Sequence, residues 1–216
     1  MKKILLIAAF LAAAAGARAT LYTTNWNSGF ANGGMIPDND PSGWVDSRTV
    51  GVVLAGTFNN LAVNLQLTGG WNGDLYAYLT HDSGFSVLLD RVGTGVSGVS
   101  SFGYGDAGMN VTLTASGTII HEYGGNSTLT SPPTGTWMTD NTSGSLASFL
   151  STDPNGTWNL FVADLSGGGA STVQSWGLEM DIVAVPEVET WVAAALAGAF
   201  GAFWLNRQIW RGIRKS

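Results

Sequence analysis

Residues 153–164 read DPNGTWNLFVAD, and this stretch decides the fold class. Its first four residues, Asp-Pro-Asn-Gly, are residue types that form tight turns. After the turn, Trp158, Leu160 and Val162 alternate with Asn159 and Ala163. Apolar side chains at every second position indicate a β-strand with one face in a core. The stretch is therefore predicted to be a turn followed by a half-buried strand.

The same alternation returns along the middle of the chain. No segment there shows a sustained helical period, and the 30 glycines and the charged fraction of only 11% favour strands joined by turns. We predict an all-β fold, an antiparallel β-sandwich of the jelly-roll, galactose-binding-like type. Its further strands are expected at residues 61–67, 111–114 and 176–182, and at Thr49–Ala55, Asp74–Thr80 and Phe85–Asp90.

The charge of this middle region is strongly negative. Between Thr20 and Val183, eleven Asp and two Glu stand against only Arg48 and Arg91, which gives a net charge of −11. Such a domain repels nucleic acid and anionic lipid, so no nucleic-acid partner is expected. The chain has no cysteine, which excludes disulfides, thiolate metal sites and cysteine nucleophiles.

The N-terminus has the pattern of a secretory signal peptide. Lys2 and Lys3 precede an apolar or small stretch from Ile4 to Gly16, and Ala17-Arg18-Ala19 fits the small-x-small cleavage pattern. We expect a signal helix at residues 1–19 that is removed on export through the Sec pathway. Residues 20–35 are interpreted as a lead-in to the folded domain.

The C-terminus carries a second apolar segment. Trp191–Leu205 has no charged residue, and a basic cluster follows it. A basic flank holds the end of a membrane helix on the cytoplasmic side, so we expect a transmembrane helix at about residues 190–206, within a tail of residues 184–216. The basic residues of the tail are Arg207, Arg211, Arg214 and Lys215.

The order of these features resembles the PEP-CTERM sorting tail. The sorting motif would be Val185, Pro186 and Glu187, followed by the apolar helix and the terminal basic cluster. In that family an exosortase in the membrane of Gram-negative bacteria processes the tail, so the resemblance implies an exosortase-type partner and an address at the cell surface or in the extracellular matrix. The family usually has Pro after the Glu, whereas this chain has Val188.

The middle region resembles the P domain (P/Homo B domain) of subtilisin-like proprotein convertases over residues 36–183. The motifs that carry the resemblance are residues 36–43 (IPDNDPSG), 72–75 (NGDL), 87–93 (VLLDRVG), 146–150 (LASFL), 153–164 and 173–178 (VQSWGL). The resemblance implies a jelly roll that braces a serine protease domain. We expect no such domain in this chain, because only about sixteen residues lie between the cleavage point and residue 36. Many bacterial members carry adjacent acidic residues where this chain has Leu113-Thr114-Ala115-Ser116, which argues against a cation site at that place.

The residues of the domain do not predict catalysis. The two histidines, His81 and His121, form no spaced zinc pair, and no Gly-x-Ser-x-Gly nucleophile motif accompanies them. We interpret His81 as an exposed turn histidine and expect no catalytic residue and no enzyme.

Two kinds of ligand remain open. Ca²⁺ needs carboxylate and carbonyl oxygens, and the candidate ligands are Asp38, Asp40 and Asp74; the alternative is that such Asp residues form Asx turns and that no cofactor binds. A sugar needs an exposed aromatic ring. Trp158 and Trp176 are assigned to the core by their alternation, whereas the unassigned aromatic residues are Trp26, Trp44, Trp71, Trp137, Tyr76, Tyr78 and Tyr104.

The sequence therefore leaves three hypotheses for function. The first is an exported, non-enzymatic surface or matrix protein that interacts with exopolysaccharide or with a surface protein. The second is a carbohydrate- or calcium-dependent binding module of the adhesin kind. The third is an accessory to a separately encoded subtilisin-like serine protease.

Overall fold

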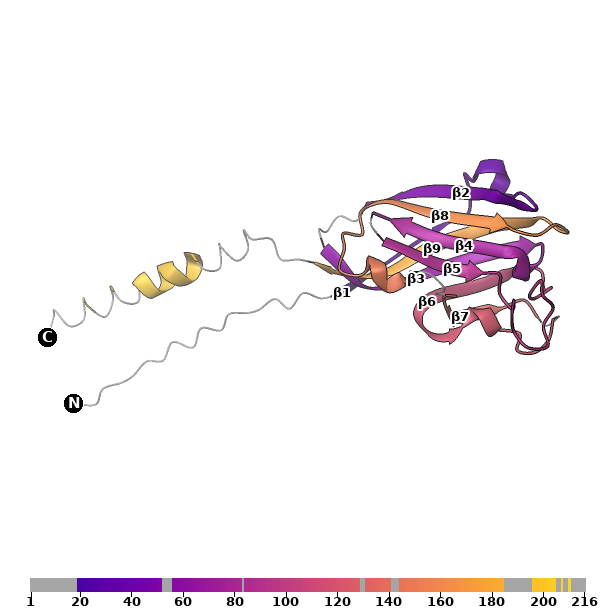
Figure 1. The fold of residues 1–216 in the computed structure, drawn as a ribbon. Helices are drawn as coiled ribbons and strands as arrows, with labels where there is room; N and C mark the ends of the chain where they lie inside the picture. The colour runs from indigo at the N-terminus through magenta and orange to yellow at the C-terminus, as the bar shows by residue number, and fades with distance from the viewer. Residues whose placement is uncertain are drawn as a thin grey trace. The chain divides into compact units, whose positions relative to one another are not determined.

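The computed structural model describes residues 19–51, 56–82, 84–128, 131–140, 144–184, 196–204, 207 and 210. Within these residues nine strands form two sheets, with strand orders β1-β9-β3-β6-β7 and β2-β8-β4-β5. The prediction of an all-β sandwich is confirmed (Figure 1). The strands are β1 (Ala19–Trp26), β2 (Asp40–Val50), β3 (Gly56–Gly69), β4 (Leu75–His81), β5 (Gly84–Asp90), β6 (Met109–Ile119), β7 (Thr134–Met138), β8 (Gly156–Asp164) and β9 (Ser171–Ala184).

The chain passes repeatedly from one sheet to the other. It runs from β2 to β3, from β3 to β4, from β5 to β6, from β7 to β8 and from β8 to β9, and each of these connections joins the two sheets. Neighbouring strands pair antiparallel, except that β6 and β7 pair parallel. Most paired strands are therefore far apart in the sequence. Loops from distant parts of the sequence also meet at the ends of the sandwich.

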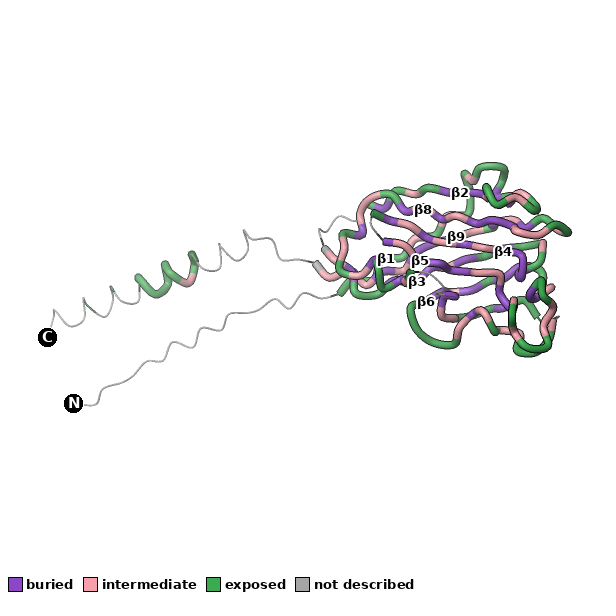
Figure 2. Tube along the Cα trace, viewed as in Figure 1, coloured by how far each residue is buried: buried purple, intermediate pink, exposed green. Residues whose placement is uncertain are grey.

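The core lies between the two sheets and is built from the predicted alternation. Trp158, Leu160 and Val162 of β8 are fully buried, and the rings of Phe58 and Phe149 pack against Trp158. Figure 2 shows the buried positions along the strands and the exposed positions mainly in the connecting loops. The remaining predicted inward positions are buried as well: Leu61, Val63, Leu65 and Leu67 of β3, Val111 and Leu113 of β6, and Trp176, Leu178, Met180 and Ile182 of β9.

One polar contact joins the two sheets through this core. The indole Nε1 of Trp176 donates a hydrogen bond of 2.7 Å to Oδ2 of Asp46, which belongs to the other sheet. Arg48 Nε donates to the same carboxylate oxygen at 2.6 Å. Asp46 is therefore a buried charge with both an indole and a guanidinium partner, as burial of a carboxylate requires.

Residues 20–35, expected to precede the domain, begin with a strand of the sandwich. β1 pairs with β9 over its whole length, and the ring of Trp26 lies 4.5 Å from that of Trp176. β1 is an edge strand with only one half-buried face, and Leu21 on its other face is 64% exposed. The apolar alternation of β1 is accordingly weak, which is why the sequence did not indicate it.

Two other strands differ from the expectation. Only Thr49 and Val50 of the strand expected at Thr49–Ala55 belong to a strand, the end of β2, and Gly51 is not in a strand; residues 52–55 lie outside the described residues. The start of β2 contains Pro41 and Gly43, which interrupt the strand pattern, and its pairing with β8 shifts register there. β7 was not predicted, because its sequence TGTWM is short and mostly exposed.

The predicted ends of the chain are described only in part. Residues 196–204 are helical, and Arg207 is helical and exposed. Among the described residues, no helix has the length and apolar character needed to cross a membrane. The predicted signal segment, apart from Ala19, and Val185, Pro186, Glu187, Arg211, Arg214 and Lys215 lie outside the described residues.

Candidate functional site

Three loops meet at one end of the sandwich. They are the turn between β3 and β4 (residues 70–74), the long loop after β5 (residues 91–108) and the loop between β8 and β9 (residues 165–170). Backbone hydrogen bonds connect them, from Gly73 N to Tyr104 O at 2.9 Å and from Leu165 N to Asp74 O at 2.9 Å. Gly73 is required for this approach, because a Cβ there would lie 2.2 Å from the carbonyl oxygen of Phe102.

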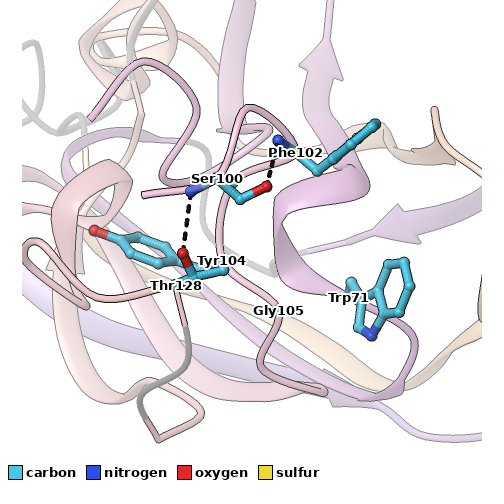
Figure 3. Close-up of a pocket in the computed structure, with 7 residues that line it drawn as sticks. Trp71, Ser100, Phe102, Tyr104, Gly105 and Thr128 are labelled. Carbon is cyan, nitrogen blue, oxygen red and sulfur yellow. Dashed lines mark hydrogen bonds between the residues drawn. The ribbon is translucent and has the colours of Figure 1, made fainter. Parts of the chain in front are cut away.

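An aromatic cleft opens in this loop end. It has a volume of about 320 Å³, and Trp71, Phe102 and Tyr104 are its aromatic walls, together with Ser100, Gly103, Gly105 and Thr128 (Figure 3). Tyr104 is fully buried, but Trp71 is 45% exposed and Phe102 is 61% exposed. Trp71 was among the aromatic residues that the sequence left unassigned. Large aromatic rings left in solvent beside a concave surface are characteristic of binding sites.

Hydrogen bonds within the loops hold the walls of the aromatic cleft in place. Ser100 N donates to Thr128 Oγ1 at 3.1 Å, and Phe102 N donates to Ser100 Oγ at 3.1 Å (Figure 3). The Tyr104 hydroxyl donates to the carbonyl of Gly125 at 2.8 Å. The aromatic cleft is therefore formed before any ligand binds, which lowers the entropic cost of binding.

The Trp71 ring rests on the loop between β8 and β9. A Cβ at Gly168 would lie 2.7 Å from Cζ3 of Trp71, so only glycine allows this contact. Gly168 also has a φ of +144°, in the region that favours glycine. The position of the indole is therefore set by the conformation of the loop around Gly168.

A carboxylate cluster, Asp38, Asp74 and Asp164, lies beneath the same loop. Asp74 and Asp164 are 1% and 0% exposed, whereas Asp38 is exposed and accepts a hydrogen bond from Gly168 N at 3.3 Å. Burial, with the nearby charges of Asp164 and Asp38, raises the pKa of Asp74 to about 6 against the opposing effect of Arg91. Burial also raises the pKa of Asp164. Nη2 of Arg91 lies 3.9 Å from Asp74 Oδ1.

Two oxygens of the carboxylate cluster lack a hydrogen-bond partner. Asp74 Oδ1 and Asp164 Oδ2 are both buried and accept no hydrogen bond, although Arg91 Nη2 lies 3.9 Å from Asp74 Oδ1. The other oxygen of Asp164, Oδ1, accepts from Ser166 N at 3.2 Å. Buried carboxylate oxygens are nearly always bonded, so this pair marks an unsatisfied polar site.

The three calcium candidates are separated by the structure. Asp38 and Asp74 interact electrostatically in the carboxylate cluster, but Asp40 accepts a hydrogen bond from Ser42 N at 2.8 Å, which is an Asx turn. Asp164 also lies at the end of a buried strand, as the sequence indicated, but the choice of calcium candidates did not include it. In the described part of the chain, no three His, Asp or Glu side chains come together as a group that could hold a metal ion.

The interpretation of His81 as an exposed turn residue is wrong. His81 is 1% exposed, and its ring nitrogens lie 3.1 Å from Thr157 O and 2.9 Å from Asp153 O. It is the last residue of β4 rather than part of the turn, so it faces the core and supports the turn before β8. Neither nitrogen is bonded to a hydroxyl that it could activate.

His121 pairs with a buried carboxylate. Its Nδ1 lies 2.9 Å from Asp140 Oδ1, and its Nε2 lies 2.9 Å from Thr94 O. Burial lowers the pKa of His121, but the hydrogen bonds to Asp140 and Thr94 outweigh burial and raise it overall. Both nitrogens face acceptors, an arrangement that the imidazolium satisfies. His121 thus ties the loop after β5 to Asp140.

Comparisons with known proteins give few matches. No protein-family model matches the chain, and no curated protein matches it. Four chains of solved structures match. One is the Aeromonas sobria serine protease in complex with the chaperone ORF2, with 14% identity and a TM-score of 0.47, covering 77% of this chain and 27% of that one. Another is the serine protease of Aeromonas sobria, with 13% identity and a TM-score of 0.44, covering 75% of this chain and 27% of that one.

This chain spans about a quarter of the length of those two structures. The description of the fold therefore rests on the strand pairing given above. The two resemblances drawn from the motifs, to the P domain and to the PEP-CTERM tail, stay predictions.

Proposed function

We propose that this chain is an exported, non-enzymatic interaction module that binds a neutral saccharide in the aromatic cleft at the loop end of its sandwich. The observation that carries the proposal is the exposure of Trp71 and Phe102 on one preformed cleft. Aromatic rings offer an apolar face on which the C–H groups of a sugar ring can pack, and Trp has a polar N–H at its edge.

The charge of the domain favours a neutral ligand. Eleven Asp and two Glu between Thr20 and Val183 would repel an anionic polymer. The ring of Trp71 and the backbone groups of Gly103 and Gly105 line the aromatic cleft. An exopolysaccharide of uncharged sugars therefore fits the cleft better than a polyanion does.

Both histidines support a non-enzymatic role. Catalysis needs a base placed beside a nucleophile, a substrate or a metal. The ring nitrogens of His81 contact two backbone carbonyls. Those of His121 contact the carboxylate of Asp140 and a backbone carbonyl. Neither ring lines the aromatic cleft.

A glycan array tests the ligand. The full chain should bind neutral oligosaccharides, and Trp71→Ala and Phe102→Ala should each weaken the signal at least about tenfold, the effect of losing about 1.4 kcal/mol of contact. Val45→Ala is the matched control, because Val45 is 49% exposed on β2 and does not line the cleft. Binding that persists in both aromatic variants contradicts the proposal.

A separate experiment tests delivery. We propose that the signal segment exports the chain, that the membrane holds it at least transiently through the apolar tail, and that an exosortase-type enzyme then releases it to the surface or matrix. Cell fractionation with mass spectrometry of the mature C-terminus should show loss of residues beyond Glu187, and Val188→Pro should increase that loss. An intact tail in the inner membrane of both forms would instead indicate a permanent anchor.

The same fractions test the accessory hypothesis. If the chain supports a separately encoded subtilisin-like protease, such a protease should co-purify with it and be lost when the sandwich is deleted. A protease that co-purifies equally with Trp71→Ala, alongside an array without signal, would replace the saccharide proposal.

A further inference from the structure

The outer edge of β1 differs from the three other sheet edges. Within the described residues, β1 pairs with β9 on one side and with no strand on the other. Its eight residues, ATLYTTNW, include no charge, no proline and no glycine, and its pairing with β9 runs from Ala19 to Trp26 without a register shift. An edge strand of this kind presents a row of unpaired backbone N–H and C=O groups that another strand can join.

The other three edges are each protected. The chain around Ser148 covers β5, because Ser148 Oγ accepts from Phe85 N at 3.1 Å and donates to Phe85 O at 2.9 Å. Asp140 N also donates to Leu88 O of β5 at 3.1 Å. β2 contains Pro41 and shifts register against β8, and β7 has only five residues. Covering segments, prolines, bulges and short strands prevent edge pairing, and β1 has none of these protections in the described structure.

The side chains of β1 limit the register in which a second copy of the strand can pair with it. Those at odd positions are exposed, whereas Tyr22 and Trp26 pack against the core. Two strands related by a two-fold axis keep exposed side chains opposite exposed ones only if the axis passes through a residue. Removal of the predicted signal segment leaves Thr20–Trp26, whose middle residue is Thr23. The axis is therefore placed at Thr23.

In this register the inner face of the paired strands is complementary. Trp26 of each copy lies opposite Thr20 of the other, and Tyr22 lies opposite Thr24. Each aromatic ring thus meets a β-branched side chain, a combination that stabilises cross-strand pairs. Tyr22 and Trp26 are only half-buried in one copy, so pairing covers apolar surface that the edge leaves in solvent.

The negative charge of the domain does not prevent this contact. β1 has no charged residue, and Glu179 and Asp181 lie on β9, opposite Thr23 and Leu21. In a continuous sheet the two β9 strands are three strand spacings apart, about 14 Å. That distance exceeds the Debye length of about 8 Å at physiological salt, so repulsion between the carboxylates of the two copies is largely screened.

We propose that β1 pairs antiparallel with β1 of a second copy of this chain, with the two Thr23 residues opposite each other, so that two five-stranded sheets become one. The contact is short and belongs to the weak, transient class of interfaces. Tethering of the chains at one surface raises their effective concentration and favours the pair. No residue of β1 lines the aromatic cleft, so the pairing does not depend on the saccharide proposal.

A single introduced thiol tests the pairing, because the chain has no cysteine. The full chain is expressed with its own signal segment, purified in mild detergent and exposed to oxidised glutathione. Thr23→Cys should form a disulfide-linked dimer at least about tenfold faster than Thr136→Cys, since opposite Cβ atoms lie about 4.5–5.5 Å apart across a strand pair. Thr136 is the matched control, an exposed threonine on β7 at the opposite edge of the same sheet. Equal rates would overturn the proposal.

Two double variants test the register, in which Leu21 of one copy lies opposite Asn25 of the other. Leu21→Lys with Asn25→Glu places opposite charges across the strand pair, whereas Leu21→Lys with Asn25→Lys places like charges there. In sedimentation velocity, the first variant should self-associate at least about tenfold more tightly than the second. The second variant has the smaller net negative charge, so a general charge effect acts in the opposite direction.

Three results would contradict the pairing. One is a wild type that stays monomeric up to about 1 mM, and another is equal self-association of the two double variants. The third is a cross-link from Thr23→Cys to other surface proteins in whole cells with none between copies, which would show that the edge serves a different partner. A glycan array without signal would leave all of these results unaffected.

Discussion

The imidazole of His81 lies flat against the indole of Trp158, with ring centroids 4.1 Å apart and an angle of 4° between the planes. Trp158 Nε1 donates to Pro154 O at 3.0 Å, and the His81 nitrogens contact the carbonyls of Asp153 and Thr157. The two rings together therefore hold both ends of the turn that precedes β8. A stacked, buried pair of this kind belongs to the framework of the sandwich.

This stacking predicts a stability cost at His81. His81→Ala should lower the free energy of unfolding by about 3 kcal/mol, because it leaves a cavity beside Trp158 and removes the contacts of the ring with the carbonyls of Asp153 and Thr157. His81→Phe keeps the ring stacking and should cost about half of that. Urea unfolding monitored by tryptophan fluorescence measures both. If His81→Ala were as stable as the wild type, the framework role would be wrong.

The hydrogen bond between the sheets predicts a second cost. Asp46→Ala leaves the Trp176 indole N–H buried without an acceptor and should lower the free energy of unfolding by about 2 kcal/mol. Asp46→Asn keeps an acceptor oxygen and should be milder. Equal losses for the two variants in urea melts would mean that the charge, held by Arg48, matters more than the acceptor.

His121 predicts a pH dependence of stability. Its pKa is raised on folding above the ordinary value of 6.5, so the folded state holds the proton more tightly. The stabilisation is fully present below pH 6.5 and is lost as the pH rises through the folded-state pKa. Asp140 and Asp90 are the charged groups that act on it.

Urea melts at about pH 6 and about pH 9 measure this change. The free energy of unfolding should fall for the wild type over this range and stay flatter in His121→Gln, which cannot titrate. Parallel pH profiles for the two proteins would show that His121 does not hold its proton through Asp140.

The edge strand β1 predicts where the domain begins. A chain that starts at residue 27 loses the pairing with β9 and the Trp26 contact on Trp176, and it should lose ~3 kcal/mol or more or fail to fold. Trp26→Ala should destabilise measurably, whereas Leu21→Thr, on the exposed face, should not. Circular-dichroism melts decide this, and full stability without β1 would restore the lead-in interpretation.

The parts of the fold that could be predicted are those with a local signal. Trp158 and Trp176 alternate with polar neighbours, and both are fully buried as expected. β1 and β7 gave no such signal, because edge strands bury one face incompletely and do not force strict alternation. The side chain of His81 faces the core because it ends a strand, which a turn-like sequence concealed.

The site was less predictable because it is assembled by topology. Asp38, Asp74 and Asp164 lie far apart in the sequence and meet because β2, β8 and β4 pair side by side in one sheet, so composition alone could not bring them together. The residue type alone does not reveal that the ring of Trp71 is exposed whereas that of Trp158 is buried. Its exposure follows from its place just before the Asn72–Asp74 turn and from its contact with Gly168.

The ¹⁹F spectrum of the 5-fluorotryptophan-labelled chain tests the saccharide proposal most directly. The nine tryptophans give one resonance each, and Trp71→Phe assigns that of Trp71. Addition of cellohexaose, chitohexaose or mannohexaose, whichever binds on the array, should shift the Trp71 resonance and leave those of the buried Trp158 and Trp176 in place. A saccharide that binds while the Trp71 resonance stays unchanged would contradict the assignment of the aromatic cleft as the binding site.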